Sequence, residues 1–297
     1  MAHDARGVHL AASALIGTVA PTVSVIGDAL LDVHAAPSTT PRPGEDVPAR
    51  VRLSPGGQGA NLAVRLARRG VPVTLICALA DDVAGRVVRA ALEADGVTLH
   101  AIEADATGVV VVLVDDRGDR TMLSQRVPFA AAAEPAASDW LLVSGYVLLE
   151  PAGEDMARSV AGTAGRRVLV GCAVPDDRAA AWRSAAMALA PDLVVMNAGE
   201  ADRLGIEGAH GIAVTDAGGA TATIGMASAD VRVPPGSEAV DTTGAGDAFA
   251  AALVSGLLDA EWPPGQAVLE GAVREAVELA SAVARAPGAQ ARVETES

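Results

Sequence analysis

The feature that most constrains the fold is a regular alternation of short β-branched runs with longer alanine-rich stretches. Strands are predicted at Val23–Ile26, Val73–Ala78, Trp140–Val143, Val168–Cys172, Leu193–Met196 and Gly211–Val214. Helices are predicted at Gly59–Arg69, Val83–Ala94, Ala152–Ala164, Ala179–Leu189 and Gln266–Arg285. This alternation predicts an α/β protein with a doubly wound, mostly parallel sheet and helices on both faces.

Two stretches, about residues 36–53 and 107–126, interrupt the alternation. The first is rich in Pro and Gly, and the second contains two strand-like runs, Val109–Val114 and Thr121–Ser124. Because they do not follow the strand–helix pattern, we expect them to form a small antiparallel β lid outside the main sheet. We expect residues 22–293 to form one domain, with an N-terminal extension at 1–21 and a tail at 294–297.

The charged residues exclude several functions. The 297-residue chain carries 22 basic residues, all of them Arg, and its formal net charge is −15. Without Lys, a Walker A nucleotide site and Schiff-base chemistry are excluded. The negative charge argues against nucleic-acid and membrane partners. Cys77 and Cys172 lie in separate apolar runs, and no apolar run is long enough to span a membrane, so we expect a cytoplasmic protein.

The most informative segment is Asp241–Phe249, which reads DTTGAGDAF and precedes the apolar run Ala248–Leu258. Gly244 and Gly246 leave backbone N–H groups uncovered at a helix start, where the helix dipole favours anions. A carboxylate at Asp247 would repel a phosphate, but it would serve as a base for a hydroxyl that attacks phosphorus. The alternative is an ordinary Gly-rich turn with Asp247 as a helix-terminal charge. A dinucleotide fingerprint, and with it an NAD-dependent oxidoreductase, fails because Phe249 stands where Gly is needed.

Three further segments carry groups suited to a polar ligand. Gly56–Asn61 (GGQGAN) opens a helix and offers the Gln58 and Asn61 amides to hydroxyl groups. Asp28 and Asp32 follow the first strand, where carboxylates bind sugar hydroxyls or simply cap a turn. Asn197 and Glu200 follow a later strand; they suit a hydrated Mg²⁺ near phosphates, or equally a helix capping box.

Together these segments resemble the signatures of the ribokinase-like (PfkB) carbohydrate kinases. Gly56–Asn61 is similar to the N-terminal signature, Asn197–Glu200 to the NxxE motif, and Asp241–Phe249 to the C-terminal signature. The motifs occur in the family's order, and the resemblance covers Val23 to Val293. It implies a ribokinase-like fold and ATP-dependent phosphorylation of a primary hydroxyl of a small sugar.

The resemblance also implies roles for individual residues. The catalytic group comprises Asp247 as general base and an anion hole of Gly244, Ala245 and Gly246. The sugar-binding residues are Asp32, Gly57, Gln58 and Asn61. The nucleotide-binding residues are Asn197, Glu200, Thr215, Gly218 and Gly219, with Glu200 holding Mg²⁺ through water. The positions for a monovalent cation such as K⁺ are Asp241 and Thr243, with Gly288 as a weaker candidate. Arg120 adds to the positive field around the phosphates.

Some positions depart from the family pattern. Thr215-Asp216-Ala217-Gly218-Gly219 is shorter and more acidic than the usual Thr-Leu-Gly-x-x-Gly loop, which leaves the nucleotide preference open. Tyr146 stands near the place of an acidic sugar contact, so ribose is not assured, although Gly288-Ala289-Gln290 resembles the ribokinase tail. The Asp-x-x-x-Arg pattern of fructokinase-like members is missing around Gly171–Arg178.

The sequence leaves two alternative functions open, and it also predicts a homodimer. A nucleoside kinase fits the same scaffold, but aromatic residues make up only 2% of the chain, which favours free sugars. The only nearby candidates for stacking on a base are Phe129, Trp140 and Tyr146. A non-catalytic sugar-binding relative is the other alternative, against which the intact Asp247 segment argues. The apolar lid strand Val109–Val114 predicts that the lid pairs with a second copy in a homodimer.

Overall fold

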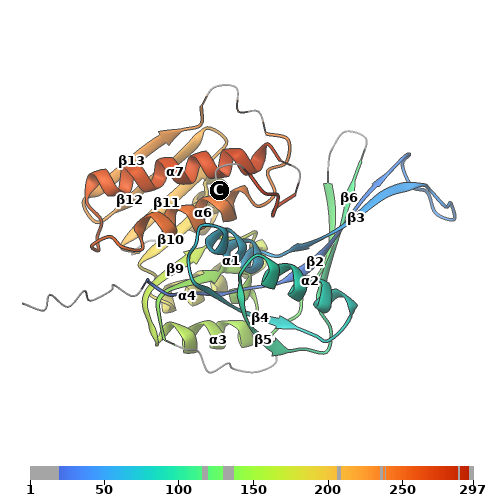
Figure 1. Ribbon diagram of the computed structural model, residues 1–297, viewed down its shortest axis with the longest axis horizontal. Coiled ribbons are helices and arrows are strands. Elements are labelled where there is room, and N and C mark those ends of the chain that lie inside the picture. Colours follow the sequence, from blue (N-terminus) through green and yellow to red (C-terminus); the bar gives the residue numbers. More distant parts are fainter. Residues whose placement is uncertain are drawn as a thin grey trace, which may run out of the picture.

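The computed structural model describes residues 20–115, 120–129, 137–205, 209–234, 237, 239–286 and 288–293. The expected tail at 294–297 and most of the expected N-terminal extension therefore lie outside the described residues. Two sheets organise this part of the chain, a large one in the body and a small one that projects from it (Figure 1).

The large sheet has nine strands in the order β13-β12-β11-β10-β9-β8-β1-β4-β5. The seven strands from β11 to β5 pair in parallel, and β12 and β13 add antiparallel pairs at one edge. The strands are β1 (Val23–Ile26), β4 (Val73–Leu79), β5 (Thr98–Glu103), β8 (Ser138–Ser144), β9 (Ala164–Val170), β10 (Leu193–Asn197), β11 (Gly211–Asp216), β12 (Gly219–Ile224) and β13 (Ala227–Arg232).

Helices cover both faces of this sheet, because alternate residues of the buried strands point to opposite faces. Val23 and Val25 of β1 pack in the core that contains α1, α6 and α7, whereas Ile26 packs in the core that contains α3 and α4. The helices are α1 (Gln58–Arg68), α2 (Val83–Ala94), α3 (Pro151–Ala161), α4 (Ala179–Ala188), α5 (Ala198–Leu204), α6 (Ala245–Leu257) and α7 (Gln266–Ala284), with short 3₁₀ turns η1 (Gly145–Leu149) and η2 (Asp176–Arg178).

The predicted doubly wound sheet is confirmed, and so is each predicted strand and helix to within a few residues at its ends. Strands β5, β12 and β13 were not predicted. Strand β12 alternates small residues, Gly219–Ile224 (GATATI), and lacks the large β-branched runs that mark the central strands. Weak hydrophobic signals at sheet edges therefore account for the missing strands.

The small sheet is the β lid, with the strand order β3-β2-β6-β7. Its strands are β2 (Leu30–Pro37), β3 (Ala49–Gly56), β6 (Gly108–Val114) and β7 (Arg120–Gln125). The prediction of an antiparallel lid holds for two of the three pairings, but β2 and β6 are parallel. The difference arises because β2, which was not predicted, continues directly from the turn after β1 and inserts between β3 and β6.

Among the described residues, no helix is long and apolar enough to cross a membrane.

Candidate active site

The predicted site residues come from segments that meet at the carboxyl ends of the parallel strands, where open α/β sheets collect ligands. Asp28 follows β1, Asn197 ends β10 and Thr215 lies near the end of β11. Two helices begin at the same edge: α1 starts at Gln58, and Asp247 lies in the first turn of α6.

The N-terminus of α6 is open toward this edge. Gly244 precedes the helix with φ of 76°, and a Cβ at this position would lie 2.8 Å from the Ala289 Cα. A Cβ at Gly246 would meet no atom within 4 Å. Among the described residues, no side chain caps this helix. The Ala245 N–H donates to the Thr242 carbonyl at 3.2 Å, and the remaining uncapped N–H groups of the first turn of α6 form a cradle suited to an anion.

Asp247 is half-buried beside this cradle and is held by two amides. The Asn61 side chain donates a hydrogen bond of 2.8 Å from Nδ2 to Asp247 Oδ2. Burial raises the pKa of Asp247 to about 6, and the nearby Asp28 carboxylate adds to the rise, whereas hydrogen bonds from Asn61 and Gln58 oppose it. At neutral pH this carboxyl group is ionised and yet basic enough to accept a proton.

Asn61 is itself fixed by a second amide. Only 5% of Asn61 is exposed, and its Oδ1 accepts a hydrogen bond of 3.0 Å from Gln290 Nε2. Gln290, Asn61 and Asp247 therefore form a chain that orients the carboxylate from behind. Sequence analysis noted Gln290 only as part of a tail motif. Its contact with Asn61 spans 229 positions, a distance that no local pattern reveals.

The Gln58 amide connects the ends of three elements. Its Nε2 donates to the Gly171 carbonyl at 2.8 Å, while its Oε1 accepts from Ser144 Oγ at 2.7 Å and from the Gly145 N–H at 3.1 Å. These contacts tie α1 to the segments that follow β8 and β9. Gln58 was predicted to bind the sugar. In the structure, both the oxygen and the nitrogen of the Gln58 side-chain amide form hydrogen bonds with other protein groups. The clearest role of Gln58 here is therefore to fix the start of α1.

Glycines allow the segment that precedes α1 to approach the segment that follows β1 closely. Gly57 has φ of 96°, and a Cβ there would lie 2.6 Å from the Asp28 carbonyl oxygen. A Cβ at Gly56 would lie 2.1 Å from Asp32 Oδ2, so the Asp32 carboxylate rests against the Gly56 backbone. Burial, together with the Asp28 charge, raises the pKa of Asp32 to about 6.

Asn197 and Glu200 form the capping box that the sequence offered as one of two interpretations. Asn197 Oδ1 accepts the Glu200 N–H at 2.9 Å, and Glu200 Oε2 accepts the Asn197 N–H at 3.1 Å. The same residues line a cavity of about 150 Å³ together with Thr215, Gly246 and Asp247. Burial raises the pKa of Glu200. The capping role is thus compatible with a position beside the anion cradle.

The loop after Thr215 is a tight hairpin. Asp216 pairs with Gly219, so only Ala217 and Gly218 form the turn between β11 and β12. Asp216 Oδ1 accepts the Gly218 N–H at 2.6 Å. Thr215 lines the cavity beside Asp247, whereas Gly218 and Gly219 are not among the described residues that line it. The shortened loop of the sequence is therefore a two-residue turn stabilised by its additional acidic residue.

Asp241 organises the loop that leads to the cradle. Its Oδ1 accepts the Thr243 N–H at 2.8 Å, and its Oδ2 accepts the Gly288 N–H at 3.0 Å. Arg120 from β7 forms an ion pair of 2.9 Å with the same carboxylate. Burial opposes ionisation of Asp241, but these hydrogen bonds and the Arg120 charge outweigh it and lower the pKa of Asp241.

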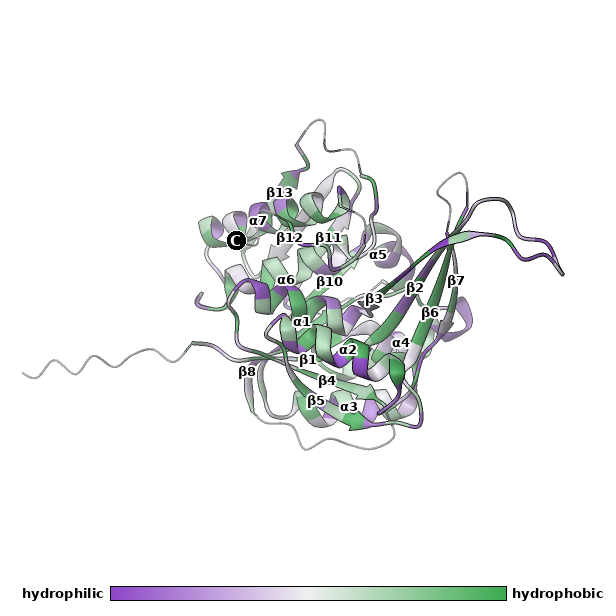
Figure 2. Ribbon diagram, turned by 45° about the vertical axis from the view of Figure 1, so that its right-hand side comes forward, coloured by the Kyte–Doolittle hydropathy of each residue, from purple (hydrophilic) through white to green (hydrophobic). Residues whose placement is uncertain are grey.

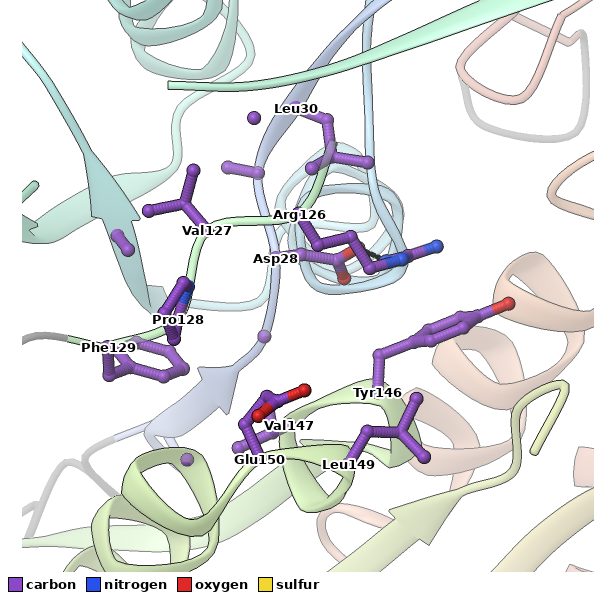
Figure 3. Close-up of a pocket in the computed structure, with 15 residues that line it drawn as sticks. Asp28, Leu30, Arg126, Val127, Pro128, Phe129, Tyr146, Val147, Leu149 and Glu150 are labelled. Carbon is purple, nitrogen blue, oxygen red and sulfur yellow. Dashed lines mark hydrogen bonds and ion pairs between the residues drawn. The ribbon is translucent and has the colours of Figure 1, made fainter. Parts of the chain in front are cut away.

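A cavity of about 340 Å³ lies next to Asp28, on the lid side of the site (Figure 3). Arg126 forms an ion pair with Asp28 and lies 3.7 Å above the centre of the Tyr146 ring. Figure 3 shows Pro128 and Phe129 on the side opposite Tyr146, and the Glu150 carboxylate directed toward the space below Asp28. Most of the wall is apolar, and the Arg126–Asp28 ion pair is part of it.

A family model described as pfkB family carbohydrate kinase matches residues 20–296. The chain belongs to this family. An ATP-dependent ribose-1-phosphate kinase from Halopiger xanaduensis is 31% identical over 78% of this chain and 79% of its own length. A fructokinase from Salmonella typhimurium is 29% identical over 84% of this chain and 88% of its own length. This pfkB family chain is therefore a phosphotransferase of the carbohydrate-kinase type.

Solved structures show the same fold. The adenosine kinase from Sinorhizobium meliloti superposes with a TM-score of 0.77 at 20% identity, covering 94% of this chain and 98% of that protein. The ribokinase from Thermotoga maritima superposes with a TM-score of 0.73 at 21% identity, covering 93% and 97%. The α/β architecture with a projecting lid is thus the pfkB family fold.

In this pfkB family site, the structure brings together most of the predicted residues but excludes one of the three aromatic candidates. Phe129 and Tyr146, two of the three aromatic candidates near the substrate, line the large cavity. Trp140 does not, because it is 2% exposed and packs edge-to-face against Trp262 at 5.6 Å. Arg126 was missed, since a single Arg after a strand carries no motif; its position opposite Tyr146 appears only in three dimensions.

Proposed function

We propose that this chain transfers the γ-phosphoryl group of ATP to a primary hydroxyl group of a small sugar, with Asp247 as the general base. The observation that carries the proposal is the position of Asp247, which is hydrogen-bonded to Asn61 and lies in the first turn of a helix whose N-terminus has no side-chain cap. A base next to an anion cradle is the arrangement that phosphoryl transfer to a hydroxyl requires.

In this mechanism the substrate hydroxyl donates its proton to a carboxylate oxygen of Asp247 as its own oxygen attacks the γ-phosphorus, and the bond from the γ-phosphorus to the β–γ bridging oxygen breaks to release ADP. The N–H groups of Gly244, Ala245 and Gly246, at the positive end of the α6 dipole, then stabilise charge on the transferred phosphoryl group. The raised pKa of Asp247, about 6, suits a base that is ionised at neutral pH. Asn61 keeps the carboxylate aligned.

Glu200 and Asn197 fit a site for Mg²⁺ and phosphates. Among the described residues, no group of three or more His, Cys, Asp or Glu side chains is arranged to hold a metal. Glu200 and Asp247 are the carboxylates that line the cavity beside Gly246, and Mg²⁺ usually keeps several waters and takes few protein ligands when phosphates supply the rest. When bound, Mg²⁺ neutralises phosphate charge. Glu200 would hold it through water, and Thr215 with the Gly218–Gly219 turn would border the nucleotide.

The sugar lies, in this proposal, between Asp247 and the root of the lid. Asp32, Gly57 and Asn61 would contact its hydroxyl groups, and Asp28 extends the polar surface toward Arg126. Carboxylates that accept hydrogen bonds from hydroxyls give charge-assisted contacts, which are stronger than neutral ones. Closure of the lid over this space would exclude water, so that the phosphoryl group passes to the sugar and not to a water molecule.

A second candidate, a nucleoside kinase, is favoured by the cavity beside Asp28. Its volume of about 340 Å³ lies beyond the residues proposed to hold the reacting hydroxyl, and its walls include Phe129, Tyr146 and Pro128. Aromatic and apolar walls of this kind suit a flat ring attached to the sugar. The paucity of aromatic residues in the whole chain therefore does not decide against nucleosides, because two of the few line this cavity.

A coupled ADP-release screen tests the proposal. The panel contains ribose, fructose, ribose 1-phosphate, keto-deoxy acids, adenosine and pseudouridine, each with Mg²⁺ and ATP. ADP release with at least one sugar-containing compound is expected. Release only with nucleosides would select the second candidate, and this release should then weaken in Phe129→Ala. Binding of a sugar without ADP release from any compound would overturn the proposal and favour a non-catalytic relative.

The lid suggests a homodimer. Register places Val33, Val51, Leu53, Val111 and Leu123 on one face, opposite the face that carries Asp32 and His34. Leu53 and Leu123 are 54% and 58% exposed, and the hydrophobic colour of β6 is visible in Figure 2. A sheet whose outer face carries exposed Val and Leu side chains is suited to stack on a second copy of itself.

A further inference from the structure

Arg120 joins the lid to the loop in front of the anion cradle. It is the first residue of β7, and its Nη2 lies 2.9 Å from Asp241 Oδ1. Its Nη1 donates a hydrogen bond to Thr243 Oγ1. The Arg120 guanidinium group thus contacts both side chains, Asp241 and Thr243, that the sequence predicted to bind a monovalent cation. Arg120 lies 121 positions before Asp241 in the chain.

Asp241 needs a positive partner at this place. Only 13% of its side chain is exposed, and it lies six residues before Asp247, in the loop that shapes the cradle. A buried negative charge here would weaken the attraction of the α6 N-terminus for phosphate. The Thr243 and Gly288 N–H groups satisfy its oxygens as hydrogen-bond donors, but neither carries a formal charge.

The residues present do not fit a dissociable monovalent cation between Asp241 and Thr243. Both side-chain oxygens that would bind it already contact the Arg120 guanidinium. Gly288, the weaker candidate, is covered by another arginine, because a Cβ at Gly288 would lie 3.2 Å from Arg52 Nη2. Two fixed positive charges next to these groups would repel an additional cation.

His34, a titratable group on the same face of the lid, does not replace Arg120. His34 pairs with Arg52 across β2 and β3 and points to the same side of the lid. Burial lowers the pKa of His34, with Arg52 and Arg120 adding to the fall and Asp241 opposing it. His34 is therefore neutral at the pH where the enzyme is expected to act. Arg120 is the cation in direct contact with Asp241.

We propose that Arg120 is a positioning residue that serves as a built-in cation for the Asp241 loop, so that this kinase works without K⁺. The inference rests on the proposed function. Arg120 neutralises Asp241, fixes Thr243 and keeps the loop in the shape that exposes the α6 N–H groups. Because Arg120 belongs to the lid and Asp241 to the body, the position of the lid also determines whether the Arg120 charge neutralises Asp241. Closing the lid over the substrate would complete the cradle.

The test compares the wild type with Arg120→Met and Arg120→Lys in KCl and in tetramethylammonium chloride at equal ionic strength. Both kcat/KM and Tm are measured. In the wild type, the two salts should give the same Tm and the same kcat/KM within about twofold. Arg120→Met should lose roughly tenfold or more in tetramethylammonium chloride, and KCl should restore part of the activity and raise its Tm. Arg120→Lys, which keeps a positive charge, should remain insensitive to K⁺.

Arg50→Met is the matched control, because Arg50 lies on the same face of the lid, on β3, and should gain no response to K⁺. A wild type that requires K⁺ would overturn the inference, and so would an Arg120→Met variant with wild-type kcat/KM and no response of Tm to K⁺. Equal K⁺ dependence in the Met and Lys variants would show that charge is not the cause. If no compound releases ADP with the wild type, the proposed function fails, while the Tm comparison still tests the cation replacement.

Discussion

Asn61 donates its side-chain N–H to Asp247 Oδ2 across 2.8 Å, although 186 positions separate the two residues. The contact joins the first turn of α1 to the first turn of α6, so the two glycine-rich segments of the sequence form one site. The contact is possible because both helices begin at the same sheet edge. The amide stabilises the ionised carboxylate, whereas burial and the Asp28 charge oppose ionisation. The balance sets the strength of the proposed base.

Asn61→Asp replaces the stabilising donor with a second carboxyl group at hydrogen-bond distance from Asp247. Two carboxylates at this distance do not both ionise readily, so the pKa of Asp247 should rise by about one unit or more. The acidic limb of kcat/KM against pH should move to higher pH by the same amount. Gln266→Glu, the same amide-to-acid change between β13 and α7, is the control and should leave the limb in place. An unmoved limb in Asn61→Asp would contradict the role of this contact.

The pH dependence of the wild type follows from the raised pKa of Asp247. Only the ionised carboxylate accepts a proton, so kcat/KM should be constant above pH 7 and fall as the pH drops through about 6. Asp32 has a pKa raised to a similar value, so it must be separated from Asp247. Asp32→Asn should bind sugar less well but keep the limb near pH 6. If the acidic limb of kcat/KM disappears in Asp32→Asn, the titrating group is Asp32 and not Asp247.

Gly244 and Gly246 allow the cradle to be tested apart from the fold. In Gly246→Ala the new methyl group meets no protein atom, so Tm should stay at or slightly above the wild-type value, since Ala favours a helix by roughly 0.5–1 kcal/mol. The methyl group would occupy the phosphate position, and kcat should fall roughly 100-fold. In Gly244→Ala the left-handed φ alone costs about 1–2 kcal/mol, and contact with Ala289 adds to the loss. Full activity of Gly246→Ala would place the phosphate elsewhere.

The lid interface is tested by two neighbouring residues on opposite faces of β7. Leu123 pairs with Val111 on the outer face, and Met122 pairs with Val112 on the inner face; both side chains are more than half exposed. Light scattering should give a dimer mass for the wild type and for Met122→Glu. Leu123→Glu should give a monomer mass, because a buried unpaired carboxylate is costly. A monomeric wild type, or a dimeric Leu123→Glu, would rule out this face as the interface.

The sequence predicted the central sheet and the catalytic segments because their signals are local. Strand β1 and helix α2 have the predicted ends, and Gly244 and Asp247 lie three positions apart in a distinctive motif. Contacts between distant segments were beyond prediction. Gln290 reaches Asn61, and Arg126 lies above Tyr146, only because the fold brings them together. Strand β2 was not predicted from the sequence, because its polar residues Asp32 and His34, which face the site, interrupt the apolar run.

The central claim is that Asp247 accepts the proton of the substrate hydroxyl. It is tested most directly by measuring kcat for Asp247→Asn, together with the dissociation constant of ATP on the same preparation. We expect kcat to fall roughly 10²–10⁴-fold, with ATP affinity unchanged within about threefold and the protein still folded. An Asp247→Asn enzyme that keeps most of its turnover would contradict the account, since an amide cannot accept this proton.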